Sequence, residues 1–343
     1  MRLKYVDVAK GLGICLVVIG HSTIPGWLDT GIRLFHMPLF FFIAGYLFNW
    51  RKHSASFGAF AAGRLRRLVV PYLVCCAIFY LAWVTVGRQH IPESESVNPL
   101  LPLAGIAYGS ALGPWLIFNR PLWFLVCLFC AELIFWCILK LCGRWGRFDQ
   151  ILSVVAVSVA GCMIGQYANV PWGADTAMAM QFFLYAGYLM RQRGFFESRR
   201  LAVVLPAIIG CAACYGLSFV YNSVSDTSQR VYGLIPLYYA GGLAGTILTV
   251  YVSMLVARVP WVERVFSELG AKSLEIMMFH IPARHALHGA GLAIPMLLES
   301  NVWVIYPLWG IAAPYAAALV IGRVRVLRLL FTGTAPTPAA AAG

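Results

Sequence analysis

The chain alternates between long apolar runs and short polar connections over most of its length. Most runs approach the roughly twenty residues that an α-helix needs to cross a bilayer, and none shows the strict alternation of a membrane β-strand. This pattern predicts an all-α fold, a polytopic integral membrane bundle of about ten transmembrane helices. The predicted spans are residues 6–24, 31–50, 68–87, 121–141, 150–168, 176–190, 201–221, 231–257, 273–291 and 302–321.

Basic residues gather in every second connection between these spans. The connections after the second, fourth, sixth and eighth spans hold most of the Lys and Arg residues, and further ones lie at both ends of the chain. Cytoplasmic loops of membrane proteins carry such an excess, so both termini are predicted to be cytoplasmic. We expect one transmembrane domain over residues 1–331 and a disordered tail over residues 332–343.

The composition agrees with a membrane protein. Of the 343 residues, 61% are hydrophobic and only 11% are charged, whereas soluble domains carry about 25% charged residues. The net charge of +13 would suggest nucleic acid only in a soluble protein. Its place in the loops makes lipid headgroups the expected partner instead. The ten cysteines lie mostly in apolar runs with no set of ligands nearby, so no metal is expected.

Polar residues in the first span are the strongest indication of function. His21 follows Lys10 by eleven residues, about three helical turns, so both side chains share one face of the helix. They differ in depth by roughly 16 Å. Asp7, one turn before Lys10, is placed to pair with it. An ionisable residue inside a membrane is energetically expensive and indicates a functional site.

A second histidine is predicted to lie near the first. The second span enters from the outer side, which places His36 at a depth close to that of His21. Two helices joined by a short connection are neighbours or nearly so, which favours a site made of both histidines. Arg33 lies one turn from His36 on the same side.

Three further polar residues lie within later spans. Glu132 is midway along the fourth span, and the ninth span holds His280 with Arg284 one turn further out. Buried charges are usually paired, so Glu132 is expected to neutralise a cation such as Lys10 or Arg284. For His280 two interpretations stay open: a bond to a neighbouring backbone group, or a functional role.

These residue types suit acyl transfer. An imidazole has an ordinary pKa near 6.5, so a neutral His21 is able to accept the proton of a hydroxyl group. Lys10, near the cytoplasmic mouth, suits phosphate. An acyl donor would fit along the line from Lys10 to His21, with its phosphates at the mouth near Lys10 and its thioester deeper, near His21. Arg64 and Arg67 would help to hold such phosphates, or contact anionic lipid.

Several motifs follow one another in an order that resembles a known family. They are Asp7 with Lys10-Gly11, His21, FHMPLFFFIAGYL (35–47), RLRRLVVPY (64–72), PLWFL (121–125) and SLEIMMFHIP (273–282). The series resembles membrane acyltransferase family three, closest to the branch with fucose 4-O-acetylase-like proteins and other polysaccharide O-acetyltransferases. The resemblance implies transfer of an acyl group, usually acetyl from acetyl-CoA, to a sugar hydroxyl of a glycan or glycolipid.

The resemblance also implies roles for single residues. The family's Arg/Lys-x10-His pair corresponds to Lys10 and His21, its aromatic-His motif to His36, and its late histidine to His280. Many relatives have Arg where Lys10 stands, and Lys lacks the bidentate fork of Arg. Many have Ser where this chain has Ala44, so a hydroxyl role is unavailable there.

We therefore expect a bacterial-type, multi-pass O-acyltransferase of the inner (plasma) membrane, with acetyl-CoA as co-substrate. His21 would act as general base or as transient acyl carrier. The predicted catalytic residues are His21, His36, Asp7, Lys10 and His280. The predicted donor-binding residues are Lys10, Arg64 and Arg67. The predicted contacts to the substrate or its oxyanion are Arg33, Trp123, Glu132 and Arg284.

Two other classes of function stay open. A flippase or exporter of a lipid-linked glycan would use Lys10 and Arg284 to contact pyrophosphate, although the sequence shows no internal repeat of the kind common in transporters. A non-catalytic subunit of a glycan-synthesis complex would use the charges for helix packing alone. The expected partners are acyl-CoA, a glycan or lipid-linked sugar acceptor, membrane lipids, and other glycan-synthesis proteins or a second copy in a homo-oligomer.

Overall fold

The computed structural model describes residues 3–89, 94–142, 146–198, 200–290 and 295–334, and most of these residues are helical. They contain no β-strand, only an isolated antiparallel bridge between Asp226 and Val231. The α-helices are α1 (Lys4–Gly20), α2 (Gly26–Tyr46), α3 (Trp50–His53), α4 (Phe57–Arg64), α5 (Val70–Thr85), α6 (Leu100–Tyr108), α7 (Trp123–Cys142), α8 (Arg147–Tyr167), α9 (Ala174–Ala179), α10 (Gln181–Gln192), α11 (Leu201–Tyr221), α12 (Ile235–Val256), α13 (Pro260–Ala271), α14 (Ser273–Ala290), α15 (Pro295–Arg323) and α16 (Arg325–Thr332).

Six helical stretches of the described residues are long and apolar enough to cross a membrane. This confirms the predicted all-α membrane fold with several crossings. The predicted count of ten spans and the cytoplasmic placement of the termini stay predictions. The six stretches are Phe57–Thr85, Arg120–Cys142, Arg147–Tyr167, Leu201–Tyr221, Ile235–Val256 and Val304–Arg323.

The other four predicted spans also correspond to helices. They are α1, α2, the pair α9 and α10, and α14. The sixth span is two helices because the chain turns at Met180, between α9 and α10. The second span ends at Tyr46, before the predicted boundary at residue 50, because Asn49 begins a new helix by capping it: its side chain accepts a hydrogen bond from the Lys52 amide at 3.1 Å.

The connection between α2 and α5 is helical and carries the predicted arginines. Ser56 caps α4 by accepting a hydrogen bond from the Ala59 amide at 3.2 Å. The helix then continues through a π-helical turn, Leu65–Val69, directly into α5. Such turns are rare and occur frequently at functional sites. This one contains Arg66 and Arg67.

Glycines allow the helices around the site to approach closely. A Cβ atom on Gly45 of α2 would lie 1.9 Å from the Leu184 carbonyl oxygen of α10. A Cβ on Gly187 of α10 would lie 2.1 Å from the Phe42 oxygen of α2. A Cβ on Gly11 of α1 would likewise lie 2.0 Å from the Phe266 backbone oxygen of α13. Small residues at such crossings let membrane helices pack backbone to backbone.

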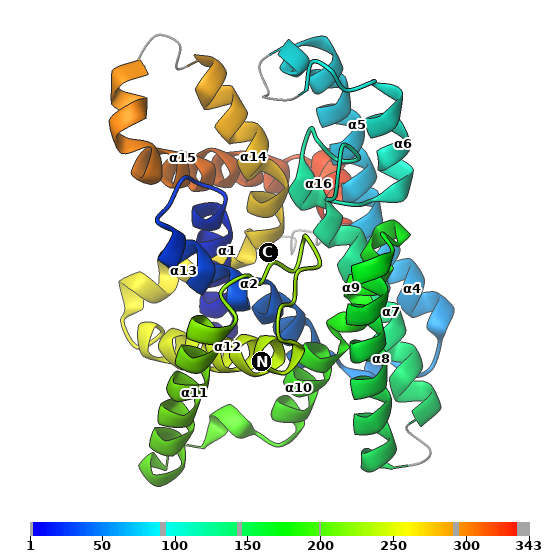
Figure 1. The fold of residues 1–343 in the computed structure, drawn as a ribbon, viewed down its shortest axis with the longest axis vertical. Coiled ribbons are helices and arrows are strands. Elements are labelled where there is room, and N and C mark those ends of the chain that lie inside the picture. Colours follow the sequence, from blue (N-terminus) through cyan, green and yellow to red (C-terminus); the bar gives the residue numbers. More distant parts are fainter. Residues whose placement is uncertain (1–2, 90–93, 143–145, 199, 291–294, 335–343) are drawn as a thin grey trace, which may run out of the picture.

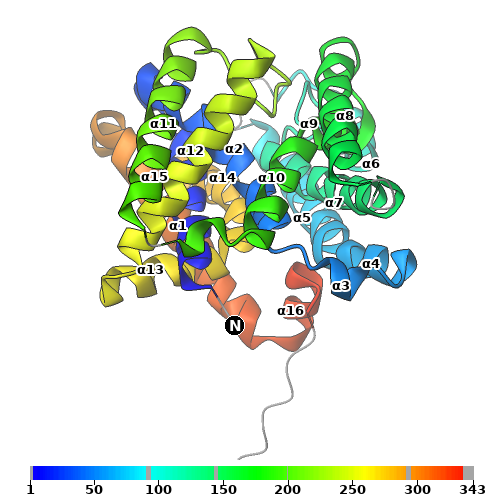
Figure 2. The ribbon, with the colours of Figure 1, turned by 90° about the horizontal axis from the view of Figure 1, so that it is seen from below.

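The helices form two groups with α2 and α10 between them. Figure 1 shows α1 and α11–α15 on one side and α5–α9 on the other. Figure 2 shows the start of α1 together with α3, α4, α13 and α16 at one face. We call this the basic face, because these helices carry Arg51, Arg64 and Arg325. The connection between α11 and α12 lies at the opposite face (Figure 2).

The end of the described chain lies at the basic face. Helix α16 includes Thr332, and Gly333 lies against the backbone of Arg66. The predicted domain boundary after residue 331 stays a prediction. Residues 335–343, most of the predicted disordered tail, lie outside the described residues.

Candidate active site

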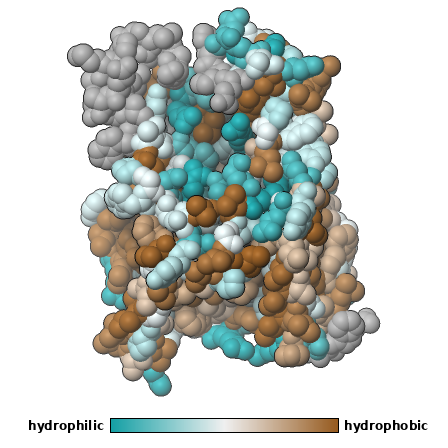
Figure 3. Space-filling model, viewed as in Figure 1, coloured by the Kyte–Doolittle hydropathy of each residue, from teal (hydrophilic) through white to brown (hydrophobic). Residues whose placement is uncertain are grey.

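A cavity of about 650 Å³ lies between α1, α2, α7 and α14. Its lining includes Lys10, toward the basic face, and Arg33 and Arg284, toward the opposite face. His21 lines it as well, which confirms the prediction that Lys10 and His21 share one face of α1. Figure 3 shows hydrophilic residues gathered across the middle of the opposite face. The cavity therefore joins four of the polar residues predicted in the first two spans, Lys10, His21, Arg33 and His36.

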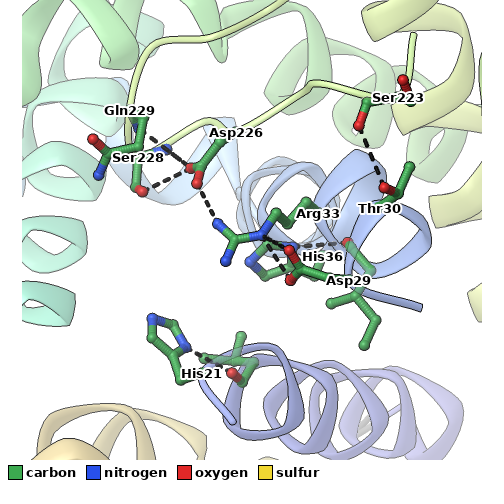
Figure 4. A network of polar contacts seen from close by, with 11 residues as sticks. His21, Asp29, Thr30, Arg33, His36, Ser223, Asp226, Ser228 and Gln229 are labelled. Atoms are coloured by element: carbon green, nitrogen blue, oxygen red, sulfur yellow. Dashed lines mark hydrogen bonds and ion pairs between the residues drawn. The ribbon is translucent and has the colours of Figure 1, made fainter. Parts of the chain in front are cut away.

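His21 directly follows Gly20, the last residue of α1, as its C-cap, and it lines the cavity. Its Nδ1 lies 2.7 Å from the carbonyl oxygen of Val17. A carbonyl oxygen only accepts hydrogen bonds, so this contact requires the ring proton on Nδ1 and leaves a lone pair on Nε2. Figure 4 shows the ring directed away from α1. The geometry thus gives His21 a basic nitrogen at the cavity wall.

Two further histidines repeat this arrangement. His36 lines the same cavity, and its Nδ1 donates to the Ile32 oxygen at 2.8 Å. His280 is buried and donates through Nδ1 to the Met277 oxygen at 2.8 Å, which is the backbone bond considered for it. The His280 ring meets that of His21 edge-on, with the ring centroids 5.0 Å apart. Within the described residues its Nε2 has no hydrogen-bond partner, and contact with His21 is its link to the site.

Arg33 is held by two carboxylates (Figure 4). Its Nε lies 2.7 Å from both oxygens of Asp29, one turn earlier on α2, and its Nη1 donates to Asp226. Asp226 belongs to the connection between α11 and α12. These bonds leave Arg33 fewer donors for the predicted oxyanion contact. They also tie α2 to a segment that lies about two hundred residues later in the sequence.

The connection at residues 222–234, here the 222–234 loop, is fixed by its own contacts. One carboxylate oxygen of Asp226 accepts hydrogen bonds from the backbone amides of Ser228 at 2.9 Å and Gln229 at 3.2 Å. Arg230 forms a buried ion pair with Asp175 of α9. The side chains of Asp226, Ser228 and Gln229 all line the cavity. The loop therefore forms part of the cavity wall on the side of the opposite face.

Arg284 and Trp123 both line the cavity. Arg284, on α14, donates through Nη1 to the backbone oxygen of His21 and so ties α14 to the end of α1. Trp123, the first residue of α7, is only 7% exposed. It supplies an apolar wall, whereas Arg284 brings a cation next to His21.

Lys10 and Asp7 form the predicted ion pair, with Nζ and Oδ1 2.9 Å apart. Only Lys10 lines the cavity that holds His21. Asp7 lines a separate pocket of about 920 Å³, together with Tyr46 and Trp50. The structure therefore places Asp7 behind Lys10, where it orients the ammonium group and does not face the cavity.

A pocket of about 600 Å³ adjoins the cavity near the basic face. Leu128 and Leu274 line both the pocket and the cavity, so the two spaces meet there. The pocket contains both predicted donor-binding arginines and two cations that the sequence analysis did not single out. Its four cations are Arg64, Arg67, Lys272 and Arg328.

Glu132 lies in this basic pocket and not beside His21. Its carboxylate is 2.8 Å from the Nε of Arg64 and is almost completely buried. This confirms that Glu132 neutralises a cation, but the named examples, Lys10 and Arg284, are wrong. Helix α4 and the π-helical turn pack against α7, which brings Arg64 to the depth of Glu132. The placement also separates Glu132 from the predicted oxyanion, so its contribution is to hold Arg64.

The polar residues of the 222–234 loop and Asp29 were not among the predicted site residues. The spacing of Asp29 and Arg33 was a readable signal, because residues four apart meet on a helix. The loop residues gave no such signal, since their partners are distant in sequence. Among the described residues, no group of three or more His, Cys, Asp or Glu side chains is placed to hold a metal ion.

Comparison with known proteins adds a family and two partial relatives. A family model described as an acyltransferase domain matches residues 3–323. The nodulation protein NolL of Mesorhizobium japonicum is 32% identical over 123 residues, which cover 33% of this chain and 32% of that protein. The NolL of Sinorhizobium fredii is 35% identical over 101 residues, which cover 24% of this chain and 28% of that protein. The matches thus span a third or less of these relatives' own length. No solved structure matches the chain.

Proposed function

We propose a reaction for this chain, which belongs to membrane acyltransferase family three. It transfers an acetyl group from cytoplasmic acetyl-CoA to a hydroxyl of a cell-surface glycan or glycolipid. Family membership makes it a membrane acyltransferase, and the donor, the acceptor, the inner-membrane location and the residue roles are our proposal. The observation that carries it is the cavity shared by Lys10 and His21, next to the basic pocket. This arrangement offers a charged entrance and, further in, a basic nitrogen.

The donor enters from the basic face in this proposal. Arg67 and Arg328 line the basic pocket, and guanidinium groups form strong charge-assisted hydrogen bonds with phosphate. From there the pantetheine arm of CoA passes Leu128 and Leu274 into the cavity. The thioester at the end of the arm is then at the level of His21.

Lys10 adds a cation along this route. Its ion pair with Asp7 holds the ammonium group on the cavity side of α1. The helix rise separates Lys10 from His21 by roughly 16 Å, a distance that an extended pantetheine arm is able to bridge. We therefore assign Lys10 to the phosphate end of the donor and His21 to the thioester end.

His21 carries the chemistry through Nε2. In direct transfer, the acceptor hydroxyl oxygen attacks the thioester carbonyl carbon while Nε2 takes the hydroxyl proton. The tetrahedral intermediate then breaks its C–S bond, and the imidazolium returns the proton to the departing thiolate. In the alternative route, Nε2 itself attacks the thioester carbonyl carbon, and the C–S bond breaks to release the CoA thiolate. The acceptor hydroxyl oxygen then attacks the acetyl carbon, the bond to Nε2 breaks, and the hydroxyl proton passes to the CoA thiolate. Both routes start from the same lone pair.

The developing oxyanion needs a hydrogen-bond donor near His21. Arg284 is the candidate we favour, because it lines the cavity and is tied to the end of α1. His36 uses its Nδ1 proton on Ile32, so its remaining nitrogen accepts hydrogen bonds and suits orientation of the acceptor hydroxyl. His280 supports the His21 ring from behind.

The variant His21→Ala tests this proposal. Membranes are prepared from cells in which the variant replaces the wild-type chain, and they are incubated with acetyl-CoA labelled in its acetyl group. The alkali-labile label on the glycan is then measured. We expect transfer to fall at least about a hundredfold, the usual effect of removing a general base. His53→Ala, on α3 and outside the cavity, is the control and retains transfer.

Two outcomes would contradict the proposal. Transfer at the wild-type rate in His21→Ala would remove His21 from the reaction. Movement of unmodified lipid-linked glycan across the membrane by the wild-type protein, without consumption of acetyl-CoA, would favour the flippase instead.

A further inference from the structure

We propose that Ser228 and Gln229, at the tip of the 222–234 loop, form with Arg120 the subsite that binds the acceptor saccharide. The inference rests on the proposed function and adds the residues that recognise its second substrate. All three residues line the cavity that holds His21. Figure 4 shows Ser228 and Gln229 next to Asp226, which joins the loop to Arg33.

The loop holds its tip in place through contacts within the protein. Asp226 and Val231 exchange two backbone hydrogen bonds, with N···O distances of 2.7 and 3.0 Å. Arg230 follows the tip with a left-handed φ of 60°, and its side chain pairs with Asp175 in the interior. A binding loop that is already ordered loses little conformational freedom when its ligand arrives. The tip is thus a preformed part of the cavity wall.

The groups at this end of the cavity suit a ligand rich in hydroxyl groups. The Gln229 side chain is exposed, and its amide supplies two donors and an acceptor. The Ser228 hydroxyl donates to Asp226 at 2.7 Å, so its oxygen is left to accept. Arg120 is also exposed, and within the described residues it forms no ion pair. Mixed donors and acceptors at one end of a cavity match the hydroxyl groups of a sugar.

The two ends of the cavity differ in chemistry. The end near the basic face adjoins a pocket with four cations, which suits a phosphorylated donor. The end with Ser228 and Gln229 offers an amide and a hydroxyl beside Arg33, Arg120 and Arg284, and two of these guanidinium groups are already bonded within the protein. His21 lines the same cavity, so donor and acceptor are able to reach it from opposite ends without displacing each other.

A kinetic separation of the two substrates tests the subsite. Membranes that carry each variant are assayed with labelled acetyl-CoA and a titration of glycan extracted from cells that lack the chain. For Gln229→Ala we expect the half-saturating glycan concentration to rise about tenfold, the effect of losing one or two hydrogen bonds, with the acetyl-CoA value unchanged. Arg67→Gln is the control for the other substrate, and it raises only the half-saturating concentration of acetyl-CoA. Val224→Ala, an exposed residue of the same loop outside the cavity lining, changes neither.

The possible outcomes separate the subsite from the proposed function. An unchanged half-saturating glycan concentration in Gln229→Ala, or equal changes for both substrates, would overturn the subsite. Wild-type transfer in His21→Ala would contradict the proposed role of His21, whereas a rise confined to the half-saturating glycan concentration in Gln229→Ala would still support the subsite.

Discussion

At the residue scale, three histidines of the candidate site form the same hydrogen bond to the backbone. His21, His36 and His280 each place Nδ1 against the carbonyl oxygen of a residue one turn earlier on the same helix. The carbonyl fixes the tautomer, so Nε2 is the nitrogen with the lone pair in all three. A helix thereby supplies an oriented base without a carboxylate partner, which would be difficult to bury in a membrane.

Substitutions of Lys10 test whether only the charge or also the shape of this cation matters at the proposed donor site. Replacing it by Gln removes a charge-assisted contact to phosphate, so we expect kcat/KM for acetyl-CoA to fall roughly 10- to 100-fold. Lys10→Arg keeps the charge and is expected to retain most of the activity, since a guanidinium group also forms charge-assisted hydrogen bonds with phosphate. The measurement is the acetyl-CoA dependence of label transfer in membranes. Equal loss in both variants would show that charge is not the function of Lys10.

At the scale of elements, the apolar runs predicted where helices form but not where they break. The turn at Met180 and the π-helical turn at Leu65–Val69 interrupt continuous apolar or basic patterns. Such features depend on which neighbour the helix meets, and hydrophobic periodicity carries no information about that neighbour. The pairing of Glu132 with Arg64 was missed for the same reason, because it follows from the packing of α4 on α7.

The contact between α2 and α10 makes a prediction about stability. In Gly45→Ala the new methyl group meets the Leu184 carbonyl oxygen, and backbone cannot move aside without separating the helices. We expect the free energy of unfolding to fall by at least about 2 kcal/mol, seen as a lower thermal unfolding midpoint in detergent. Gly210→Ala is the matched control on α11, where a Cβ has no neighbour within 4 Å. That change should leave the midpoint unchanged or raise it, because Ala favours a helix. Equal midpoints in the two variants would contradict the close packing.

At the scale of the whole molecule, the proposal has two substrate routes that meet at His21. The shared line of Lys10 and His21 was predictable from the sequence, because helical periodicity alone puts the two residues on one face of α1. The pair Asp29 and Arg33 was readable in the same way. The wall formed by the 222–234 loop was not predictable, since the contact of Asp226 with Arg33 depends on how α11 and α12 fold back over α2.

The central claim is that the acyl group of a CoA donor reaches His21 from the basic face. Affinity labelling with bromoacetyl-CoA tests it most directly, because its reactive carbon lies next to the position of the thioester carbonyl. We predict a covalent adduct on His21, identified by mass spectrometry of its peptide, that excess acetyl-CoA prevents and that Arg67→Gln weakens. Bromoacetamide, which lacks the CoA part, should show no preference for His21. Labelling of another residue that acetyl-CoA protects, with His21 unmodified, would contradict the account.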